Sequence, residues 1–389
     1  MELYNTLSRK KERFETIKPG EVNIYVCGIT PYDTTHLGHA FTYISFDVLI
    51  RYLRFKGYKV NYTQNVTDID DDILRKAKEQ KKDWQELGKF WTDRFLNDLK
   101  FLNVFPPTHY VKATDSINKI IKMVDSLINK GYAYEKRGNV YFETKKFKNY
   151  GKLSKYNKSQ MILISKERGA DPKDPLKKNP LDFILWQNEK PGEPSWQTPW
   201  GKGRPGWHIE CSAMVNTYLG DRIDIHGGGR DLVFPHHESE IAQSESFTGK
   251  KPYVKYWMHT SMVLYEGEKM SKSLGNMIMI SDLAKKYPAD IIRFMLLSHH
   301  YREPWEFEDL EMDDVEKKMS EIKKALNKKS GNGKTKLNYL RKFESLMDDD
   351  LNTPKVLELI SEMAYDINKN NVNLKQDMKK CLEILGFIV

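Results

Sequence analysis

The sequence predicts an α/β protein with a parallel sheet, an insertion and a mostly helical C-terminal part. An apolar strand at 22–26 leads through Cys27 and Gly28 into helical spacing over about 36–56, and a second strand follows at 60–64. A crossover of this length joins parallel strands. Beyond Ser281, an expected helix N-cap, the pattern is helical almost to the end.

The length of 389 residues predicts two or three domains. We expect a Rossmann-type nucleotide-binding domain in two halves, 1–104 and 181–300, separated by an inserted connective region at 105–180. A helical stem or bundle follows at 301–389, and no separate anticodon-reading domain is expected after it. Lys328 to Lys336 is a candidate linker.

The formal charge of +9 is compatible with a polyanionic partner such as RNA, although a lysine-rich proteome explains it about equally well. Three scattered cysteines form no disulfide framework and indicate a reducing cytoplasm. No apolar run approaches the roughly 20 residues of a membrane span, and the N-terminus has no signal-peptide pattern.

The inserted region begins after a helical stretch at 84–102, which Pro106 and Pro107 interrupt. An amphipathic helix is expected at 117–128, and a hairpin at 132–143 turns at Gly138-Asn139. The lysine-rich stretch 145–178 has little apolar periodicity, so we expect part of it to be an ordered loop or lid.

The second half contains a Gly/Pro-rich turn at 201–206, a short strand at 223–225 and a strand at 256–264 that ends in a Glu266-Gly267 turn. Thr353-Pro354 predicts a helix start with proline in the first turn.

Four residues could meet at one Zn²⁺: Cys27 and Cys211, each expected at a strand end, with His236 and Glu240 at i and i+4 on one helix face. From spacing alone, the alternative is that both cysteines are small buried hydrophobes and that His236, His237 and His226 make core hydrogen bonds. The aspartates 68–72 are better explained by a helix N-terminus than by a metal.

A second group joins His36 and His39 with Lys269 and Lys272. A strand that delivers glycine into a helix N-terminus favours bound anions, and the sequence lacks a Walker loop. Imidazole N–H groups and ammonium groups can stabilise the charge that develops when a carboxylate attacks ATP at its α-phosphate. A solvated lysine surface is the alternative for the two lysines.

The motifs together resemble the cysteinyl-tRNA synthetase family of class I, including its relative, the mycothiol-pathway ligase that joins cysteine to glucosaminyl-inositol. The resemblance rests on His36-Leu37-Gly38-His39, Gly203 to Cys211, Ile225 to Gly229, Phe234 to His237 and Lys269 to Asn276, and it spans nearly the whole chain.

The resemblance implies activation of L-cysteine by ATP, with Mg²⁺, on a site holding one Zn²⁺ per chain, whose metal–sulfur bond rejects serine. It implies zinc ligands Cys27, Cys211, His236 and Glu240, and catalytic roles for His36, His39, Lys269 and Lys272. The cysteine-binding positions it implies are Gly28, Thr42, Asn65, Thr67 and Trp207, and the ATP or adenylate positions are Gly28, Thr30, His36, His39, Gly229, Arg230, Asp231, Val263 and Lys272.

The acceptor stays open between two relatives. Glu167 to Pro172 is close to the ligase's own signature, whereas Glu240, the segments 207–214 and 347–354 and the lysine-rich composition favour the synthetase, which we prefer. The expected acceptor is therefore tRNA(Cys), with an amino sugar as the alternative and an inactive RNA-binding paralogue as the remote one. We expect a cytoplasmic monomer with no membrane association.

Overall fold

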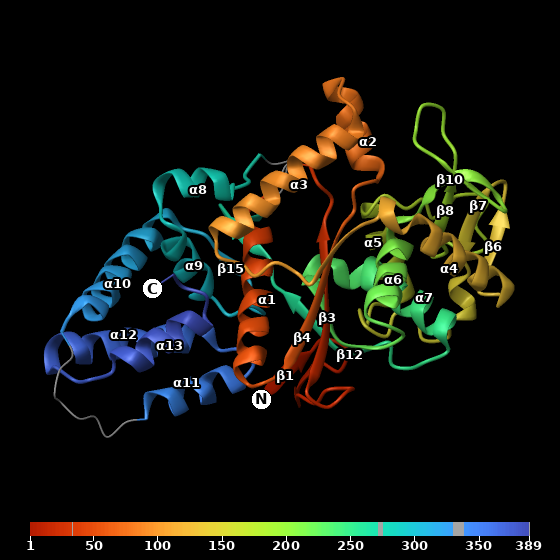
Figure 1. The fold of residues 1–389 in the computed structure, drawn as a ribbon. Coiled ribbons are helices and arrows are strands. Elements are labelled where there is room, and N and C mark those ends of the chain that lie inside the picture. The colour runs from red at the N-terminus through yellow and green to blue at the C-terminus, as the bar shows by residue number, and fades with distance from the viewer. Residues whose placement is uncertain (33, 271–274, 330–337, 389) are drawn as a thin grey trace.

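A computed structural model describes residues 1–32, 34–270, 275–329 and 338–388. Its centre is a five-stranded sheet in the order β12-β11-β3-β4-β5, with every neighbouring pair parallel. The strands are β3 (Glu21–Ile29), β4 (Lys59–Val66), β5 (His109–Lys112), β11 (Ile223–Gly229) and β12 (Val254–Thr260). Figure 1 shows this sheet between an inserted region on one side and the C-terminal helices on the other.

Helix α1 (Leu37–Phe55) crosses from β3 to β4, as the sequence predicted. Fourteen of its residues are buried, because it lies between the sheet and the C-terminal helices. Two helices, α2 (Asp71–Gln80) and α3 (Trp84–Phe101), then form a hairpin that projects above the carboxyl ends of the strands (Figure 1). The last two aspartates of the 68–72 run, Asp71 and Asp72, begin α2, and Asp70 caps it by accepting from the N–H of Ile73.

The inserted region has its own antiparallel sheet in the order β6-β7-β8-β10-β9. Helix α4 (Ile117–Asn129) and the hairpin of β6 (Ala133–Lys136) and β7 (Asn139–Phe142) match the prediction. Strands β8 (Phe183–Asn188), β9 (Trp196–Thr198) and β10 (Gly201–Pro205) complete it. Because β5 belongs to the parallel sheet and β8–β10 to this one, the sheets favour an insertion near 113–206; the limits 105–180 remain only a prediction.

Several local predictions were wrong. The expected turn at 201–206 is strand β10. Helix α5 (Lys158–Glu167) was not expected within 145–178, whereas the irregular residues on both sides of it agree with an ordered loop over part of that stretch. The single strand at 256–264 is two strands, β12 and β13 (Val263–Tyr265). Helix α8 (Ile280–Lys286) is capped at Met279, so Ser281 stands inside it.

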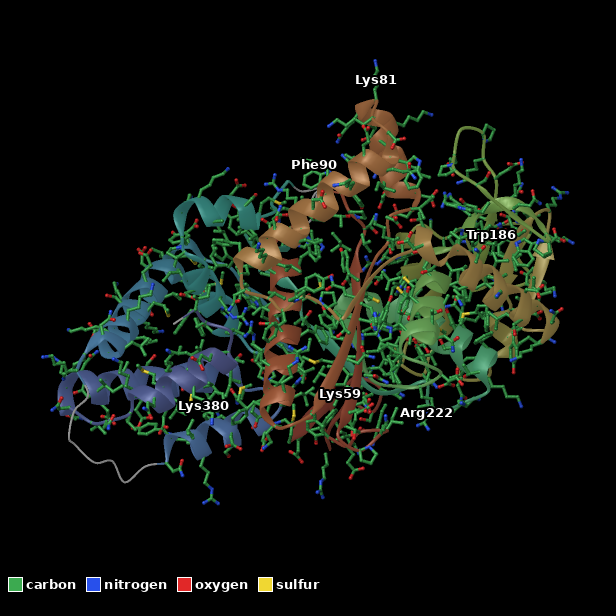
Figure 2. All side chains as sticks on the ribbon, in the orientation of Figure 1. Lys59, Lys81, Phe90, Trp186, Arg222 and Lys380 are labelled. Carbon is green, nitrogen blue, oxygen red and sulfur yellow. The ribbon has the colours of Figure 1, made fainter. Side chains whose placement is uncertain are left out.

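The C-terminal part packs on α1 through one large apolar core that also covers one face of the parallel sheet. A second core joins the other face to the inserted region, and it includes Trp186, which Figure 2 places inside that region. The helices are α9 (Ala289–Leu297), α10 (Asp309–Asn327), α11 (Tyr339–Asp348), α12 (Thr353–Asn370) and α13 (Lys375–Ile384); the expected linker at 328–336 lies mostly outside the described residues.

Two helices, α6 (Trp207–Tyr218) and α7 (Glu238–Thr248), precede and follow β11. Two small sheets complete the described structure: β1 (Glu2–Asn5) pairs with β2 (Lys10–Arg13), and β13 pairs with β14 (Glu268–Lys269) and β15 (Trp305–Glu306). Among the described residues, no helix combines the length and apolarity needed to cross a bilayer.

Candidate active site and metal centre

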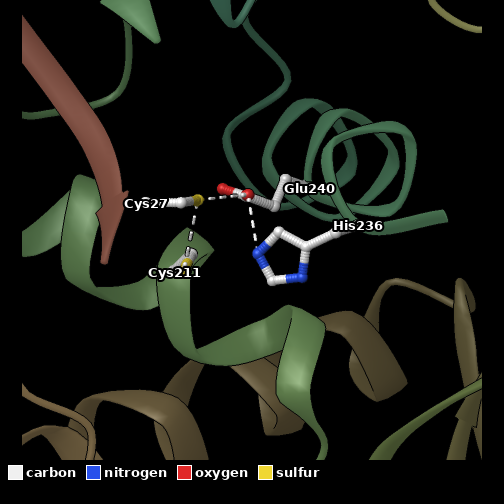
Figure 3. Close-up of side chains that lie close together, drawn as sticks. All are labelled: Cys27, Cys211, His236 and Glu240. Carbon is white, nitrogen blue, oxygen red and sulfur yellow. Dashed lines mark hydrogen bonds and ion pairs between the residues drawn. The ribbon is translucent and has the colours of Figure 1, made fainter. Parts of the chain in front are cut away.

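Four side chains from four different elements meet below the carboxyl end of β3. Cys27 comes from β3, Cys211 from α6 (Trp207–Tyr218), His236 from the wide helical turn 233–237, and Glu240 from α7 (Glu238–Thr248) (Figure 3). Cys211 therefore lies on a helix and not at the strand end that the sequence suggested. All four side chains are buried, and one ligand atom of each lies within 4.8 Å of the others.

The distances fit a tetrahedral cation. Tetrahedral zinc with ordinary bond lengths separates two sulfur ligands by about 3.8 Å and a nitrogen from an oxygen by about 3.3 Å. Here the Sγ atoms of Cys27 and Cys211 are 3.9 Å apart, and His236 Nε2 is 3.2 Å from Glu240 Oε1. Nδ1 of His236 contacts Nδ1 of His208 at 3.0 Å, which leaves Nε2 for the cluster. The donor set of two sulfurs, one nitrogen and one oxygen suits Zn²⁺.

The charges of the cluster also favour a cation. Burial of Cys211 acts to raise the pKa of its thiol. The contacts with Cys27 and His236 outweigh this effect and lower the pKa to about 6. Burial of Glu240 is likewise outweighed by His226 and His236, and its pKa falls to about 2. Cys211 and Glu240 are therefore negative near neutral pH. Burial of His236 is outweighed by these two neighbours, which raise its pKa to about 10, so a bound metal would take the place of a proton on this imidazole. Burial raises the pKa of Cys27 well above that of an ordinary thiol, so this sulfur needs a cation to lose its proton.

A second set of four shares Cys27 and Glu240 but replaces the other two ligands by His226 and His237. His237 Nε2 lies 3.2 Å from Cys27 Sγ, and His226 Nε2 lies 2.9 Å from Glu240 Oε2. His237 Nδ1 also contacts His259 Nε2 at 2.7 Å. The hydrogen-bonding role expected for both histidines is confirmed, but the sequence did not show that they touch the ligands.

A cleft of about 790 Å³ opens next to this cluster, and Cys27 is part of its lining. Of the positions predicted for cysteine or the adenylate, those that line it are Gly28, Thr30, His36, His39, Thr42, Thr67, Trp207, Gly229, Asp231 and Val263. Asn65 and Arg230 do not line it. Asn65 lies behind the wall, where its Oδ1 accepts from the N–H of Gly28 at 2.8 Å and its amide donates to Thr67 Oγ1 at 3.3 Å.

The N-terminus of α1 opens into the same cleft. His36 caps this helix by accepting from the N–H of His39 at 3.4 Å, and the two imidazoles stack with ring centroids 3.6 Å apart. Backbone N–H groups and the helix dipole make this position favourable for phosphate. Another cleft-lining position, Gly28 near the end of β3, requires glycine, because a Cβ there would lie 1.6 Å from the carbonyl oxygen of Asn65 on the neighbouring strand β4.

The lysine loop is only partly described. Lys269 stands in β14, and Lys272 lies outside the described residues. Met270 and Met277, on the two sides of 271–276, both line the cleft.

Several lining residues were missed by sequence reasoning. Arg75 and Lys76 on α2 carry no motif that could have revealed them, and Tyr32 was noted only as part of the strand–helix turn. Arg168 was noted for its resemblance to the ligase signature, and the structure places it at the cleft with Nη1 3.7 Å from Asp231.

Comparison with known proteins places this architecture among the class I tRNA synthetases. In solved structures the fold is similar to methionyl-tRNA synthetase of Mycobacterium tuberculosis in complex with methionyl-adenylate, with a TM-score of 0.66 over 90% of this chain and 83% of that one, at 16% identity. This likeness concerns the fold alone.

Sequence comparison defines the family more closely. Residues 13–317 match the tRNA synthetases class I (C) catalytic domain, and residues 342–388 match the DALR domain. The chain is 45% identical to the cysteine–tRNA ligase of Legionella pneumophila strain Corby, over 100% of this chain and 85% of that protein. It is 47% identical to the cysteine–tRNA ligase of Methanococcus maripaludis strain C7, over 95% of this chain and 80% of that protein. The chain therefore belongs to the cysteinyl-tRNA synthetase family.

Proposed function

We propose that this chain is a cysteine–tRNA ligase: it activates L-cysteine with ATP to cysteinyl-AMP and transfers the cysteinyl group to tRNA(Cys). The observation that carries the proposal is the position of Cys27, which belongs both to the metal-ligand cluster and to the lining of the cleft that opens at the α1 N-terminus. The family and the names of its relatives agree with this activity.

Cys27, Cys211, His236 and Glu240 would hold Zn²⁺, which supplies a thiolate-binding site that serine cannot use equally well. Thr42 and Trp207 line the cleft beside the cluster and would position the amino acid. Trp207 lies with its ring centroid 4.2 Å from that of His236, so the indole lines the cleft directly beside the cluster. The amide of Asn65 would fix this wall from behind by holding Gly28 and Thr67.

The phosphates of ATP would bind at the α1 N-terminus, where His36 and His39 donate to the charge that develops on the α-phosphate and the leaving pyrophosphate. Gly229, Asp231 and Val263, which also line the cleft, would contact the nucleoside. Arg230, Lys269 and Lys272 remain in the proposal from family resemblance. The reaction then depends on positioning and electrostatics, with magnesium accompanying ATP.

The test is cysteine-dependent pyrophosphate exchange combined with transfer of labelled cysteine to total tRNA. We expect both activities, and Lys272→Ala should abolish exchange. Exchange without charging would indicate an amine acceptor, with glucosaminyl-inositol as the next acceptor to assay. No exchange by the unaltered protein would indicate an inactive RNA-binding paralogue. Sedimentation and cell fractionation test the accompanying proposals of a monomer in the cytoplasm.

A further inference from the structure

Glu210 is a buried carboxylate that neither the metal-ligand cluster nor the proposed reaction uses. Its side chain is 0% exposed, and neither oxygen has a partner in good hydrogen-bond geometry among the described residues. It stands three residues after Trp207 on α6, so these two side chains are neighbours on the helix surface. The charged groups that act on it most strongly are acids, namely Cys211, Asp70 and Asp68. A buried carboxylate in such surroundings is costly unless a cation comes near it.

Thr67 connects this carboxylate to the cleft. Its hydroxyl approaches Glu210 as a hydrogen-bond donor. Thr67 also lines the cleft, as Trp207 does. The threonine therefore lies between the buried carboxylate and the space in which the amino acid is expected to bind.

The direction of the Thr67 hydroxyl follows from its other neighbour, Asn65. The N–H of Gly28 donates to Asn65 Oδ1 at 2.8 Å, so the other end of this amide is its NH₂ group. That group donates to Thr67 Oγ1 at 3.3 Å. A hydroxyl has one proton and two lone pairs. Since Asn65 occupies one lone pair and the proton is directed to Glu210, one lone pair remains for the cleft.

Thr30, which also lines the cleft, is oriented in the same way. Its hydroxyl donates to Oδ2 of Asp70 at 3.1 Å. The N–H of Thr67 donates to the carbonyl of Ile29 at 3.0 Å, so the two threonines stand side by side at the carboxyl ends of β3 and β4. Two hydroxyl oxygens thus offer lone pairs, and an acid lies behind each. Such a position favours a ligand group that donates hydrogen bonds and carries positive charge.

We propose that Glu210 is a positioning residue that holds the Thr67 hydroxyl so that its oxygen accepts a hydrogen bond from the ammonium group of L-cysteine. The proposal rests on the proposed function, which supplies the amino acid. An ammonium group has three protons, of which Thr67 and Thr30 accept two. Its charge offsets that of the acids behind them. A thiol acid without this group would leave both oxygens without a donor, and a site built for a hydrogen bond discriminates strongly against such an analogue.

The test measures the binding of two ligands to the full chain loaded with Zn²⁺, by calorimetry. The ligands are L-cysteine and 3-mercaptopropanoate, which is cysteine without its ammonium group. In Glu210→Gln the new amide can donate to Thr67, which turns the hydroxyl proton toward the cleft. Affinity for L-cysteine should fall at least about tenfold, since a hydrogen bond to a charged group is lost. Affinity for 3-mercaptopropanoate should not fall. Glu210→Asp keeps an acceptor with a shorter reach, and its affinity for L-cysteine should lie between those of Glu210→Gln and the unaltered protein.

Glu245→Gln is the matched control. Glu245 is also buried, but it pairs with Lys152 at 2.7 Å and is not among the residues that line the cleft. This variant should bind both ligands as the unaltered protein does. Metal content after dialysis should be unchanged in all three variants. In pyrophosphate exchange by Glu210→Gln, the KM for cysteine should rise while kcat stays close to that of the unaltered protein.

An equal loss of affinity for both ligands in Glu210→Gln would indicate a merely structural role and would overturn the proposal. No loss of affinity for L-cysteine, or a loss of zinc, would overturn it as well. If Glu210→Gln does not fold, the same comparison in Glu210→Asp decides. If the unaltered protein binds L-cysteine but supports no exchange, the proposed function fails, and the binding comparison still decides the role of Glu210. If the unaltered protein binds no L-cysteine, both fail.

Discussion

Replacing Cys211 by serine tests which atoms bind the metal. A structural zinc site is worth about 10–16 kcal/mol, so one of four ligands contributes about 2.5–4 kcal/mol on average. Its loss should weaken zinc affinity about 70- to 900-fold. The Sγ separation of 3.9 Å between Cys27 and Cys211 and the burial of both are the reasons to expect the full effect.

Replacing His226 by alanine provides a second variant, whose zinc affinity can be compared with that of Cys211→Ser. The Nε2 atom of His226 lies 2.9 Å from Glu240 Oε2, the carboxylate oxygen that His236 does not contact. A group that only orients a ligand typically contributes 10- to 100-fold to affinity, so His226→Ala should lie between Cys211→Ser and the unaltered protein. Cys381→Ser is the control, because Cys381 is buried in α13 and belongs to neither ligand set.

The assay is competition for zinc with a chromogenic chelator, together with metal content after dialysis. Discrimination between cysteine and serine in pyrophosphate exchange should fall together with zinc in Cys211→Ser. The reasoning is refuted if Cys211→Ser binds zinc within about threefold of the unaltered protein while His226→Ala loses more than about 100-fold. That result would assign the metal to Cys27, His226, His237 and Glu240.

Three further predictions concern the surroundings of the site. Asp47→Ala should lower the free energy of unfolding in urea by about 3–5 kcal/mol, because it leaves the buried guanidinium of Arg293 without its carboxylate. Gly28→Ala should reduce exchange at least about 100-fold, because a Cβ 1.6 Å from the Asn65 carbonyl must displace the cleft wall. Burial raises the pKa of Asp70 from 3.8 to about 6, so its ionisation destabilises the folded state as pH rises through that interval. Asp70→Asn should therefore gain unfolding free energy relative to the unaltered protein between pH 4.5 and pH 7.5.

Each of these predictions has a matched control. Asp282→Ala removes an exposed pair with Lys285 and should scarcely change stability. Gly192→Ala strains one turn of the inserted region, where φ is +79°, but its Cβ has nothing within 4 Å and the turn does not line the cleft, so exchange should stay intact. Asp83→Asn is the control for Asp70→Asn, because it makes the same change at the exposed N-cap of α3. Equal free energies of unfolding for Asp47→Ala and Asp282→Ala would contradict the argument about Arg293. Full exchange activity in Gly28→Ala would contradict the argument about the cleft wall, and a pH-independent effect of Asp70→Asn on stability would contradict the argument about its pKa.

Periodicity predicted the elements whose burial is one-sided or that follow a clear turn signal. Helix α4 buries Ile117, Ile120, Val124 and Leu127 at helical spacing, and the sequence was sufficient to find it. Helix α5 has a run of four apolar residues, 161–164, of which only Met161 is buried, so no 3.6-residue pattern marks it. This helix is stabilised by its tertiary contacts with the 233–240 segment.

Strand β10 was missed because its composition is that of a turn. Gly203 and Pro205 are poor strand residues, yet β8 and β9 pair with β10 on its two sides. A Cβ on Gly203 would lie 2.0 Å from the carbonyl oxygen of Gln187, so glycine allows the backbones to approach. The break between β12 and β13 depends similarly on a distant partner, since the N–H of Ser261 donates to the carbonyl of Tyr301 at 2.7 Å.

The metal-ligand candidates were predictable in part. The i, i+4 spacing places His236 and Glu240 together, but only the fold brings Cys27 to Cys211 across 184 positions of the sequence. The positions of the histidines behind these ligands could not be predicted from sequence spacing, because His226 comes from β11 and His259 from β12. Neighbouring parallel strands place these two residues near one cluster, and that neighbourhood follows from strand order, which the sequence pattern did not supply.

Geometry also ranks the two overlapping ligand sets. Glu240 points Oε1 toward His236 and Oε2 toward His226, so one carboxylate could serve either set. His237, however, has its Nδ1 engaged by His259 and does not line the cleft, although its Nε2 contacts Cys27, which does. His236 lies against Trp207, which does line it. In the proposed function the cation must meet a substrate thiol and so has to face the cleft. We therefore infer that Cys27, Cys211, His236 and Glu240 are the better ligand set, with His226 and His237 as their supports.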